Sequence, residues 1–224
     1  MSATPPPLDV LYEDNHVLAV NKPPRMLTAG DRTGDVSLLD LAREYIRTKY
    51  LKPGKVYLGV VHRLDRPVSG VVLLARTSKA AARLSEQFRM RTPVKIYQCL
   101  VEGDVTAANG TLIDWVKKDT DRNIVEIVAP DSAEAQRCVL HYRRLRRIGS
   151  RSLLEVTLET GRSHQIRVQL AHAGMPICGD TKYGSRVRLG GAIALHAASI
   201  TFDHPVRHES ITVAAEFPAE WPEL

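Results

Sequence analysis

The stretch that decides the fold is Gly59-Val-Val-His-Arg-Leu-Asp-Arg-Pro-Val-Ser-Gly-Val-Val-Leu-Leu-Ala75. Its apolar, β-branched runs, 56–61 and 71–75, are typical of buried strands. The polar insert between them, residues 62–69, is therefore expected where two core strands meet. Within this insert Asp65 lies between two arginines. Two interpretations stay open from this stretch alone, a structural ion pair at a turn and an active site, because both gather charged groups.

The composition favours one globular domain with a polyanionic partner. The chain has 224 residues, of which 44% are hydrophobic, and this is enough for a substantial core. Thirty-one Lys and Arg residues against 25 Asp and Glu residues give a net charge of +6. Aromatic residues are only 5%, which disfavours stacking on a series of unpaired bases as the main binding mode. We expect residues 1–7 to be a disordered lead and residues 8–224 to form a single domain.

The three cysteines and the lack of a long apolar segment favour the cytoplasm as the protein's compartment. Cys99, Cys138 and Cys178 are odd in number and show no C-x-x-C spacing, which favours a reducing environment and disfavours a zinc site. The chain starts without a basic and apolar leader pattern, and no segment approaches the ~18 apolar residues of a membrane span. We therefore expect a cytoplasmic protein without a membrane partner.

Periodicity and capping signals predict more strands than helices. Helices are expected over about 38–50, after the cap residue Ser37, over about 78–90, after Thr77 or Ser78, and over 163–174, capped by Ser163. Further strands are expected over 10–12, 17–20, 94–101, 112–116, 124–128, 137–145, 153–159, 193–202 and 211–216. Because most of these strands are joined by hairpins, the predicted class is α+β, with a largely antiparallel mixed sheet and flanking helices.

Several common chemistries lack their motif. The sequence contains no G-x-x-x-x-G-K-[ST] loop, no G-x-G-x-x-G after a strand and no G-x-S-x-G elbow. The eight histidines show no H-E-x-x-H pattern, so a catalytic metal is not expected. His172 is expected to be an ordinary polar residue.

What remains is one carboxylate in the core loop, Asp65, a tyrosine on a strand, Tyr97, and a helix start that bears arginines, 162–167. An ionised aspartate can act as a base or as a nucleophile. Acid catalysis of the ordinary glycosidase kind needs a second placed carboxylate, and none is evident. A pocket with a carboxylate, a ring and an arginine suits a flipped nucleobase.

Four motifs in order resemble the RluA family of pseudouridine synthases, and the resemblance extends over most of the chain. The motifs are Asn21-Lys-Pro-Pro, the H-R-L-D-R signature within 59–75, Lys95-Ile-Tyr-Gln-Cys-Leu-Val-Glu-Gly103, and Thr160-Gly-Arg-Ser-His-Gln-Ile-Arg167 with Gly179-Asp-Thr-Lys-Tyr-Gly184 and Leu195-His-Ala197. The resemblance implies the pseudouridine synthase fold with a central RNA-binding catalytic cleft.

The resemblance also implies a reaction and its residues. Uridine in RNA is isomerised to its C5-glycoside without cofactor or metal, and Asp65 is the catalytic aspartate. Tyr97 matches the tyrosine that stacks on the base, and Arg167 matches the basic residue that pairs with the aspartate. Arg63 matches an arginine that fills the gap left by the flipped nucleotide. The remaining substrate contacts implied in this way are His62, Gln165, Ile166 and Leu195.

The expected partner is structured RNA, either 23S rRNA or tRNA, bound by a monomer. The chain departs from the family at Pro67-Val68, where relatives commonly carry a threonine, and we expect this to affect loop packing more than chemistry. It also shows no small N-terminal RNA-binding domain before the signature. Target choice is therefore expected to depend on the basic loops at 146–151 and 186–190.

Two other functions stay open. An RNA-binding module could keep the fold without catalysis, although the presence of Asp65, Tyr97 and Arg167 argues against this. A base-excising N-glycosylase would share base flipping but would release free uracil.

Overall fold

The computed structural model describes residues 7–218 and Trp221. Residues 1–6 of the expected disordered lead lie outside this part of the chain. The described residues form two compact units. Unit 1 contains residues 7–93 and 197–218, and unit 2 contains residues 94–196 and Trp221.

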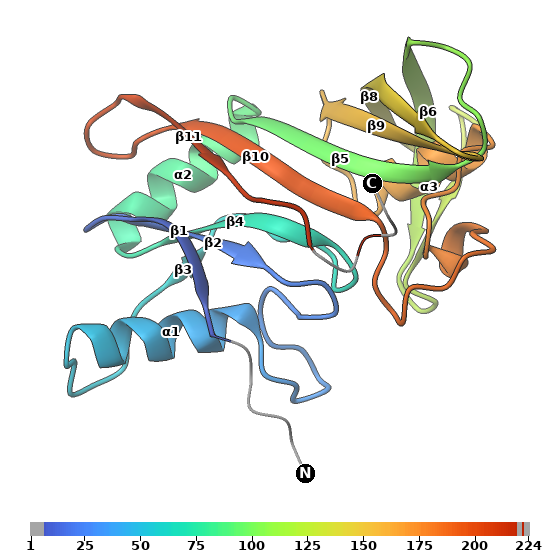
Figure 1. Ribbon diagram of the computed structural model, residues 1–224. Coiled ribbons are helices and arrows are strands. Elements are labelled where there is room, and N and C mark those ends of the chain that lie inside the picture. The colour runs from blue at the N-terminus through green and yellow to red at the C-terminus, as the bar shows by residue number, and fades with distance from the viewer. Residues whose placement is uncertain (1–6, 219–220, 222–224) are drawn as a thin grey trace. The chain divides into compact units, whose positions relative to one another are not determined.

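Unit 1 is built on antiparallel strands (Figure 1). Its strands are β1 (Asp9–Glu13), β2 (Val17–Lys22), β3 (Gly59–Val60), β4 (Ser69–Ala75), β10 (Leu195–Asp203, of which Leu195 and His196 belong to unit 2) and β11 (Ser210–Ala214). The pairs β1–β2, β2–β4 and β10–β11 are antiparallel, and β10 lies next to β4.

Strand β4 is the centre of this unit, as the apolar run at 71–75 predicts, because all seven of its residues are buried. Gly70 allows a close approach to β10. Its φ is +115°, and a Cβ at this position would lie 2.3 Å from the carbonyl oxygen of Ala197. Only glycine fits here without a shift of the backbone.

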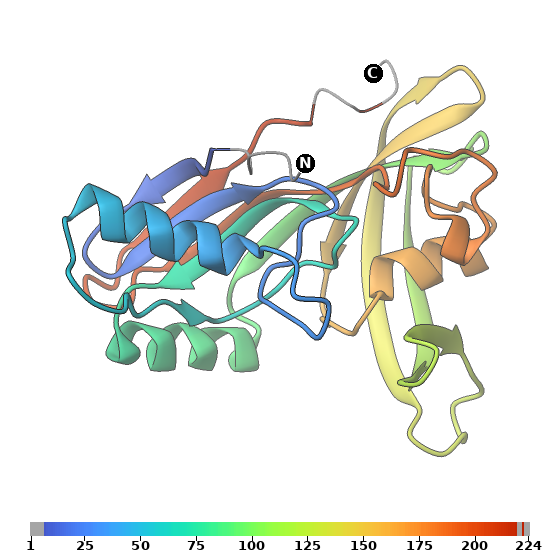
Figure 2. The ribbon, with the colours of Figure 1, turned by 90° about the horizontal axis from the view of Figure 1, so that it is seen from below.

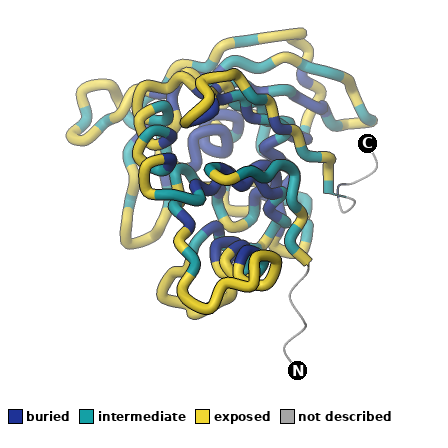
Figure 3. Tube along the Cα trace, turned by 90° about the vertical axis from the view of Figure 1, so that its left-hand side faces the viewer, coloured by how far each residue is buried: buried dark blue, intermediate teal, exposed yellow. Residues whose placement is uncertain are grey.

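Two helices lie along the strands of unit 1 (Figure 2). Helix α1 (Leu38–Lys49) begins with the predicted cap, where the Ser37 hydroxyl accepts from the amide of Asp40 and the Asp40 carboxylate accepts from the amide of Ser37. Its buried and exposed residues alternate along the coil (Figure 3). Helix α2 (Ser78–Met90) begins after Thr77 and packs Ala80 and Leu84 into a core with β2, β4, β10 and β11.

The predicted buried strand over 56–61 is wrong. Only Gly59 and Val60 form a strand, β3, which pairs with the end of β4. Tyr57 is 52% exposed and Val60 is 38% exposed. An apolar run at the edge of a sheet has the composition of a core strand, but it lacks a neighbour on its other side.

Unit 2 contains a second group of antiparallel strands. They are β5 (Val94–Glu102), β6 (Asn109–Asp119), β7 (Ile124–Ile127), β8 (Gln136–Ile148) and β9 (Arg151–Leu158), in the order β5-β9-β8-β6-β7. Helix α3 (Gln165–His172) packs Val168 against Val116, Val125 and Cys138 of these strands. A short 3-10 helix, η1 (Thr181–Tyr183), follows.

Helix α3 exists as predicted, but it does not begin with Ser163. The residue before its first turn is His164, which has a φ of +50° and makes no capping hydrogen bond. The side chain of Gln165 holds the segment before the helix, because its Oε1 accepts from the amide of Arg162 at 3.0 Å.

Together these elements confirm the predicted α+β class with a mostly antiparallel, mixed sheet. No helix among the described residues is long and apolar enough to span a membrane.

Candidate active site

The residues predicted for the site belong to both units. His62, Arg63 and Asp65 lie in one loop of unit 1, between β3 and β4. Tyr97 lies on β5, Gln165, Ile166 and Arg167 lie on α3, and Leu195 starts β10, all within unit 2.

The loop that carries Asp65 is held from both sides by the segment after β2. Thr28, which is buried, donates from its hydroxyl to the carbonyl of Leu64 at 3.0 Å and accepts from the amide of the same residue at 3.2 Å. The amide of Val68 donates to the carbonyl of Asp65 at 3.1 Å and closes a turn. The backbone on both sides of the carboxylate is therefore fixed, which favours a preorganised site.

Lys22 lies beneath this loop and is completely buried. Its ammonium donates to the carbonyls of Pro23 at 3.0 Å, Met26 at 2.7 Å and Arg66 at 3.2 Å. Burial lowers its pKa to about 7, although the attraction of nearby Asp65 raises it. Unit 1 thus places a cation close to the predicted catalytic carboxylate and fixes the carbonyl next to it.

The two arginines that flank Asp65 in sequence are both exposed. Arg66 forms an exposed ion pair with Asp35 at 2.7 Å and donates to the carbonyl of Arg25 at 3.1 Å. Arg63 is exposed, as a residue that reaches into RNA has to be.

His62 is tied to the protein itself. Its Nε2 accepts from the amide of Leu73 at 2.9 Å, so this nitrogen carries no proton, and its ring stacks on Phe88 at 4.6 Å. These contacts place the histidine in the support of the loop. Its role as a substrate contact stays a prediction.

In unit 2, Arg167 forms a bidentate ion pair with Asp180. Its Nε lies 2.6 Å from Oδ2 and its Nη2 lies 2.9 Å from Oδ1, and both side chains are buried. The guanidinium also lies 5.0 Å from the ring centroid of Tyr183. Such a pair fixes both position and orientation of the guanidinium.

Tyr183 joins this ion pair to the start of α3. Its hydroxyl accepts from the amide of Val125 at 2.9 Å and shares a 2.7 Å hydrogen bond with Nδ1 of His164. His164 and Arg167, which are three residues apart, thus both contact the same ring.

The other predicted residues of unit 2 differ in exposure. Tyr97 is half-buried and lies opposite Val156 in the β5–β9 pairing. Gln165 is 2% exposed and uses its side chain within the protein, where Nε2 donates to the carbonyl of Val139 at 3.0 Å. Ile166 and Leu195 are also buried. Contact with a substrate stays a prediction for all four.

Three supporting residues are not predicted from the sequence, namely Lys22, Thr28 and Asp180. A signal for Lys22 exists, because alternation in β2 places it on the same face as Leu18 and Val20, which are buried. Asp180 stands in a quoted motif without an assigned role. Thr28 has no local signal, since its partner Leu64 is distant in sequence.

Among the described residues, no group of three or more His, Cys, Asp or Glu side chains is placed to bind a metal ion. The three cysteines are free and buried. Burial raises the pKa of Cys178 to about 11, so this thiol stays protonated at neutral pH.

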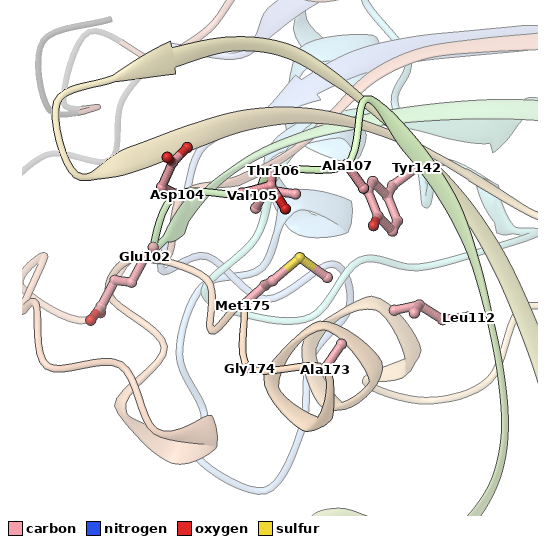
Figure 4. A pocket seen from close by; sticks show the side chains of 11 residues that line it. Glu102, Asp104, Val105, Thr106, Ala107, Leu112, Tyr142, Ala173, Gly174 and Met175 are labelled. Carbon is pink, nitrogen blue, oxygen red and sulfur yellow. The ribbon is translucent and has the colours of Figure 1, made fainter.

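One pocket of unit 2, of about 340 Å³, contains none of the predicted site residues (Figure 4). Met175, Leu112 and Tyr142 face its interior, whereas the carboxylate of Glu102 points away from it. The pocket is lined by Glu102, Gly103, Asp104, Val105, Thr106, Ala107, Leu112, Tyr142, Ala173, Gly174 and Met175. It offers no group placed for the predicted chemistry.

Comparison with known proteins identifies the chain's relatives. Residues 16–172 match the family described as RNA pseudouridylate synthase. An RNA pseudouridine synthase of Bacillus subtilis, YhcT, is 34% identical over 97% of this chain and 71% of the relative. The ribosomal large subunit pseudouridine synthase D of Xanthomonas campestris is 36% identical over 96% of this chain and 67% of the relative. The tRNA pseudouridine synthase C of Pectobacterium carotovorum is 35% identical over 96% and 60%.

Solved structures agree on the fold. Human RNA pseudouridylate synthase domain containing 4 superposes with a TM-score of 0.79 at 24% identity, over 94% of this chain and 89% of that one. Its relative, domain containing 1, gives a TM-score of 0.75 at 23% identity, over 94% and 84%. The resemblance seen in the sequence motifs is confirmed. The chain belongs to the RNA pseudouridylate synthase family, of the RluA type, whose members isomerise uridine in RNA.

Proposed function

We propose that this chain isomerises specific uridines of structured RNA, rRNA or tRNA, with Asp65 as its catalytic residue. The observation that carries the proposal is the braced loop of unit 1. Backbone groups on both sides of Asp65 are fixed by Thr28 and Lys22, and the neighbouring Arg66 forms its ion pair with Asp35.

The reaction breaks two bonds and forms two others. The N1–C1′ bond of uridine is cleaved, the uracil rotates in the site, and C5 bonds to C1′. The C5 hydrogen then leaves as a proton while N1 is protonated, so the product is an isomer of the substrate. Asp65 assists cleavage as nucleophile or base, Tyr97 stacks on the base, and Arg167 supplies positive charge. No redox step occurs, so no cofactor is required.

We further propose that residues 8–224 act together as one catalytic domain, as a cytoplasmic monomer without a metal. Arg63 enters the gap left by the flipped uridine, and His62, Gln165, Ile166 and Leu195 support the substrate or its pocket. Arg63 is exposed, which fits entry into the gap left by the uridine. The burial of Gln165, Ile166 and Leu195 fits support of the pocket.

Release of tritium from 5-tritiated uridine in RNA tests the proposal. The variants Asp65→Ala and Asp65→Asn should lose the activity, while their RNA affinity stays within severalfold, because phosphate contacts supply most of the binding. Asp31→Asn, a change of an exposed aspartate in unit 1, is the matched control and should keep full activity.

Three results would contradict the proposal. Full tritium release by Asp65→Ala would exclude Asp65 as the catalytic residue. Free uracil in the product would indicate an N-glycosylase. Wild-type protein that binds RNA but releases no tritium from any cellular RNA would favour a binding module.

A further inference from the structure

The end of strand β5 joins two basic segments of unit 2. Gly103, the residue after β5, donates from its amide to the carbonyl of Ser150 at 3.0 Å, and the hydroxyl of Ser152 donates to the carbonyl of Gly103 at 3.1 Å. These bonds fix the turn of the β8–β9 hairpin against the end of β5.

The neighbouring residue, Glu102, fixes the loop after η1. Its carboxylate accepts from the amides of Arg186 at 2.9 Å and Val187 at 3.3 Å, and from the hydroxyl of Ser185. Burial opposes the charge of Glu102, but the hydrogen bonds from three successive loop residues outweigh it and lower its pKa. The side chain points out of the pocket of Figure 4, so its charge serves the loop.

The loop over 185–191 is closed at its far end as well. The amide of Ala192 donates to the carbonyl of Leu189 at 3.0 Å across two glycines with positive φ. Gly179 packs beneath this turn, since a Cβ there would lie 2.7 Å from the carbonyl oxygen of Ala192. The loop is therefore built as a fixed structure beside the hairpin.

Five arginines lie on these two segments, 146–151 and 185–191, and one of them, Arg147, forms an ion pair. Arg151 is paired with Glu102 in the β5–β9 register, and alternation along β9 and β8 places Arg146 on the same face. Arg186 and Arg188 are exposed on the loop. Within residues 7–218, no carboxylate forms an ion pair with the side chain of any of the four.

Two neighbouring arginines are different, because the protein uses their charge. Arg147 pairs with Asp104 at 2.7 Å, and Arg144 donates to the carbonyls of Val105 and Thr106. The contrast separates arginines that hold the fold from arginines whose guanidinium groups are available to a partner.

We propose that Arg146, Arg151, Arg186 and Arg188 form one surface that binds the phosphate backbone of RNA. The inference rests on the proposed function, which supplies RNA as the partner, and it adds where that partner is held. Guanidinium groups match phosphate geometry, and a fixed loop loses little conformational entropy on binding. Contacts of this kind position an RNA and do not read its bases.

The salt dependence of RNA binding tests this surface. We would compare the wild type, a variant with all four arginines changed to Gln, and a matched control with Arg32, Arg43, Arg89 and Arg122 changed to Gln. Both variants lose the same charge, and the control positions are exposed or half-exposed. Binding of a labelled RNA duplex of about 20 base pairs is measured by anisotropy from low to high salt.

The surface variant should bind at least about tenfold more weakly, with a salt slope smaller by about 3 to 4, since each lost phosphate contact removes about 0.7 to 0.9. The control should keep nearly the wild-type slope. Equal losses in both variants would show that only net charge matters and would overturn the inference. Because the assay measures binding alone, an active Asp65→Ala protein would refute the proposed function without affecting this result.

Discussion

Lys22 is an ionisable residue whose burial disfavours its charge and whose ammonium donates to three backbone carbonyls. It is completely buried, and the three carbonyls that accept from its ammonium include that of Arg66, directly after Asp65. An ammonium without such acceptors would be too costly at this depth. The residue therefore links the end of β2 to the geometry of the loop that carries Asp65.

Lys22 should make stability depend on pH in a defined window. The unfolded chain keeps the lysine proton up to a pKa of about 10.5, whereas the folded protein loses it near 7. Between these values the unfolded state binds more protons, so this residue's contribution to the free energy of unfolding rises with pH. From pH 7.5 to 9.5 the wild type should gain about 2 kcal/mol relative to Lys22→Met in denaturant unfolding.

The exposed Lys79 provides the control for this prediction, because Lys79→Met should leave the pH dependence unchanged. NMR titration of the Lys22 side chain gives a direct check in the wild type. A midpoint near 10.5 would show that burial does not perturb this group.

At the scale of elements, helix α3 and the 3-10 helix η1 are joined by buried charges. Arg167 lies on α3, and its ion-pair partner Asp180 directly precedes η1. The ring of Tyr183 contacts the guanidinium of Arg167. The arrangement fixes the arginine that the sequence motifs assign to the site. It also means that Asp180 supports the site through Arg167.

The variant Asp180→Asn should lose about 3 kcal/mol of unfolding free energy, because it removes the negative charge that Asp180 places beside a buried guanidinium. It should also lower the rate of tritium release more than it weakens RNA binding. The measurements are denaturant unfolding and single-turnover kinetics. Glu44→Gln, which removes an exposed pair with Arg47, is the control and should change neither. Similar behaviour of the two variants would contradict the role of Asp180.

Local signals in the sequence predicted the elements that depend on local interactions. Ser37 and Thr77 cap their helices as expected, because a cap is a contact within one turn. The prediction of a buried strand over 56–61 is wrong, because the composition of this run does not reveal that it lies at the edge of the sheet. Ser163 does not cap α3, since the helix begins one residue later and His164 occupies the cap position.

The site could be predicted in part for the same reason. Asp65, Tyr97 and Arg167 stand in motifs that the sequence displays directly. Their supports, Thr28 and Lys22, contact the loop across long separations in sequence, and a single sequence carries no record of such pairs.

At the scale of the whole molecule, the chain passes between its two units at 93–94, at 196–197 and again after 218. The second crossing falls inside strand β10, whose bounds are Leu195 and Asp203. If only one unit unfolded, part of strand β10 would have to unfold while the rest of the same strand stayed folded. We therefore expect the two units to unfold together, as the proposal of one catalytic domain requires.

The two tryptophans make this expectation measurable, because Trp115 and Trp221 both belong to unit 2. The variant Leu73→Ala creates a cavity in the core of unit 1 and should cost about 2 to 5 kcal/mol. If the units unfold as one, the midpoint of denaturant unfolding followed by tryptophan fluorescence moves as far as the midpoint followed by circular dichroism. Lys79→Ala, an exposed change in the same unit, should move neither. A fluorescence midpoint that stays at its wild-type value, with an earlier second transition in circular dichroism, would show two independent domains.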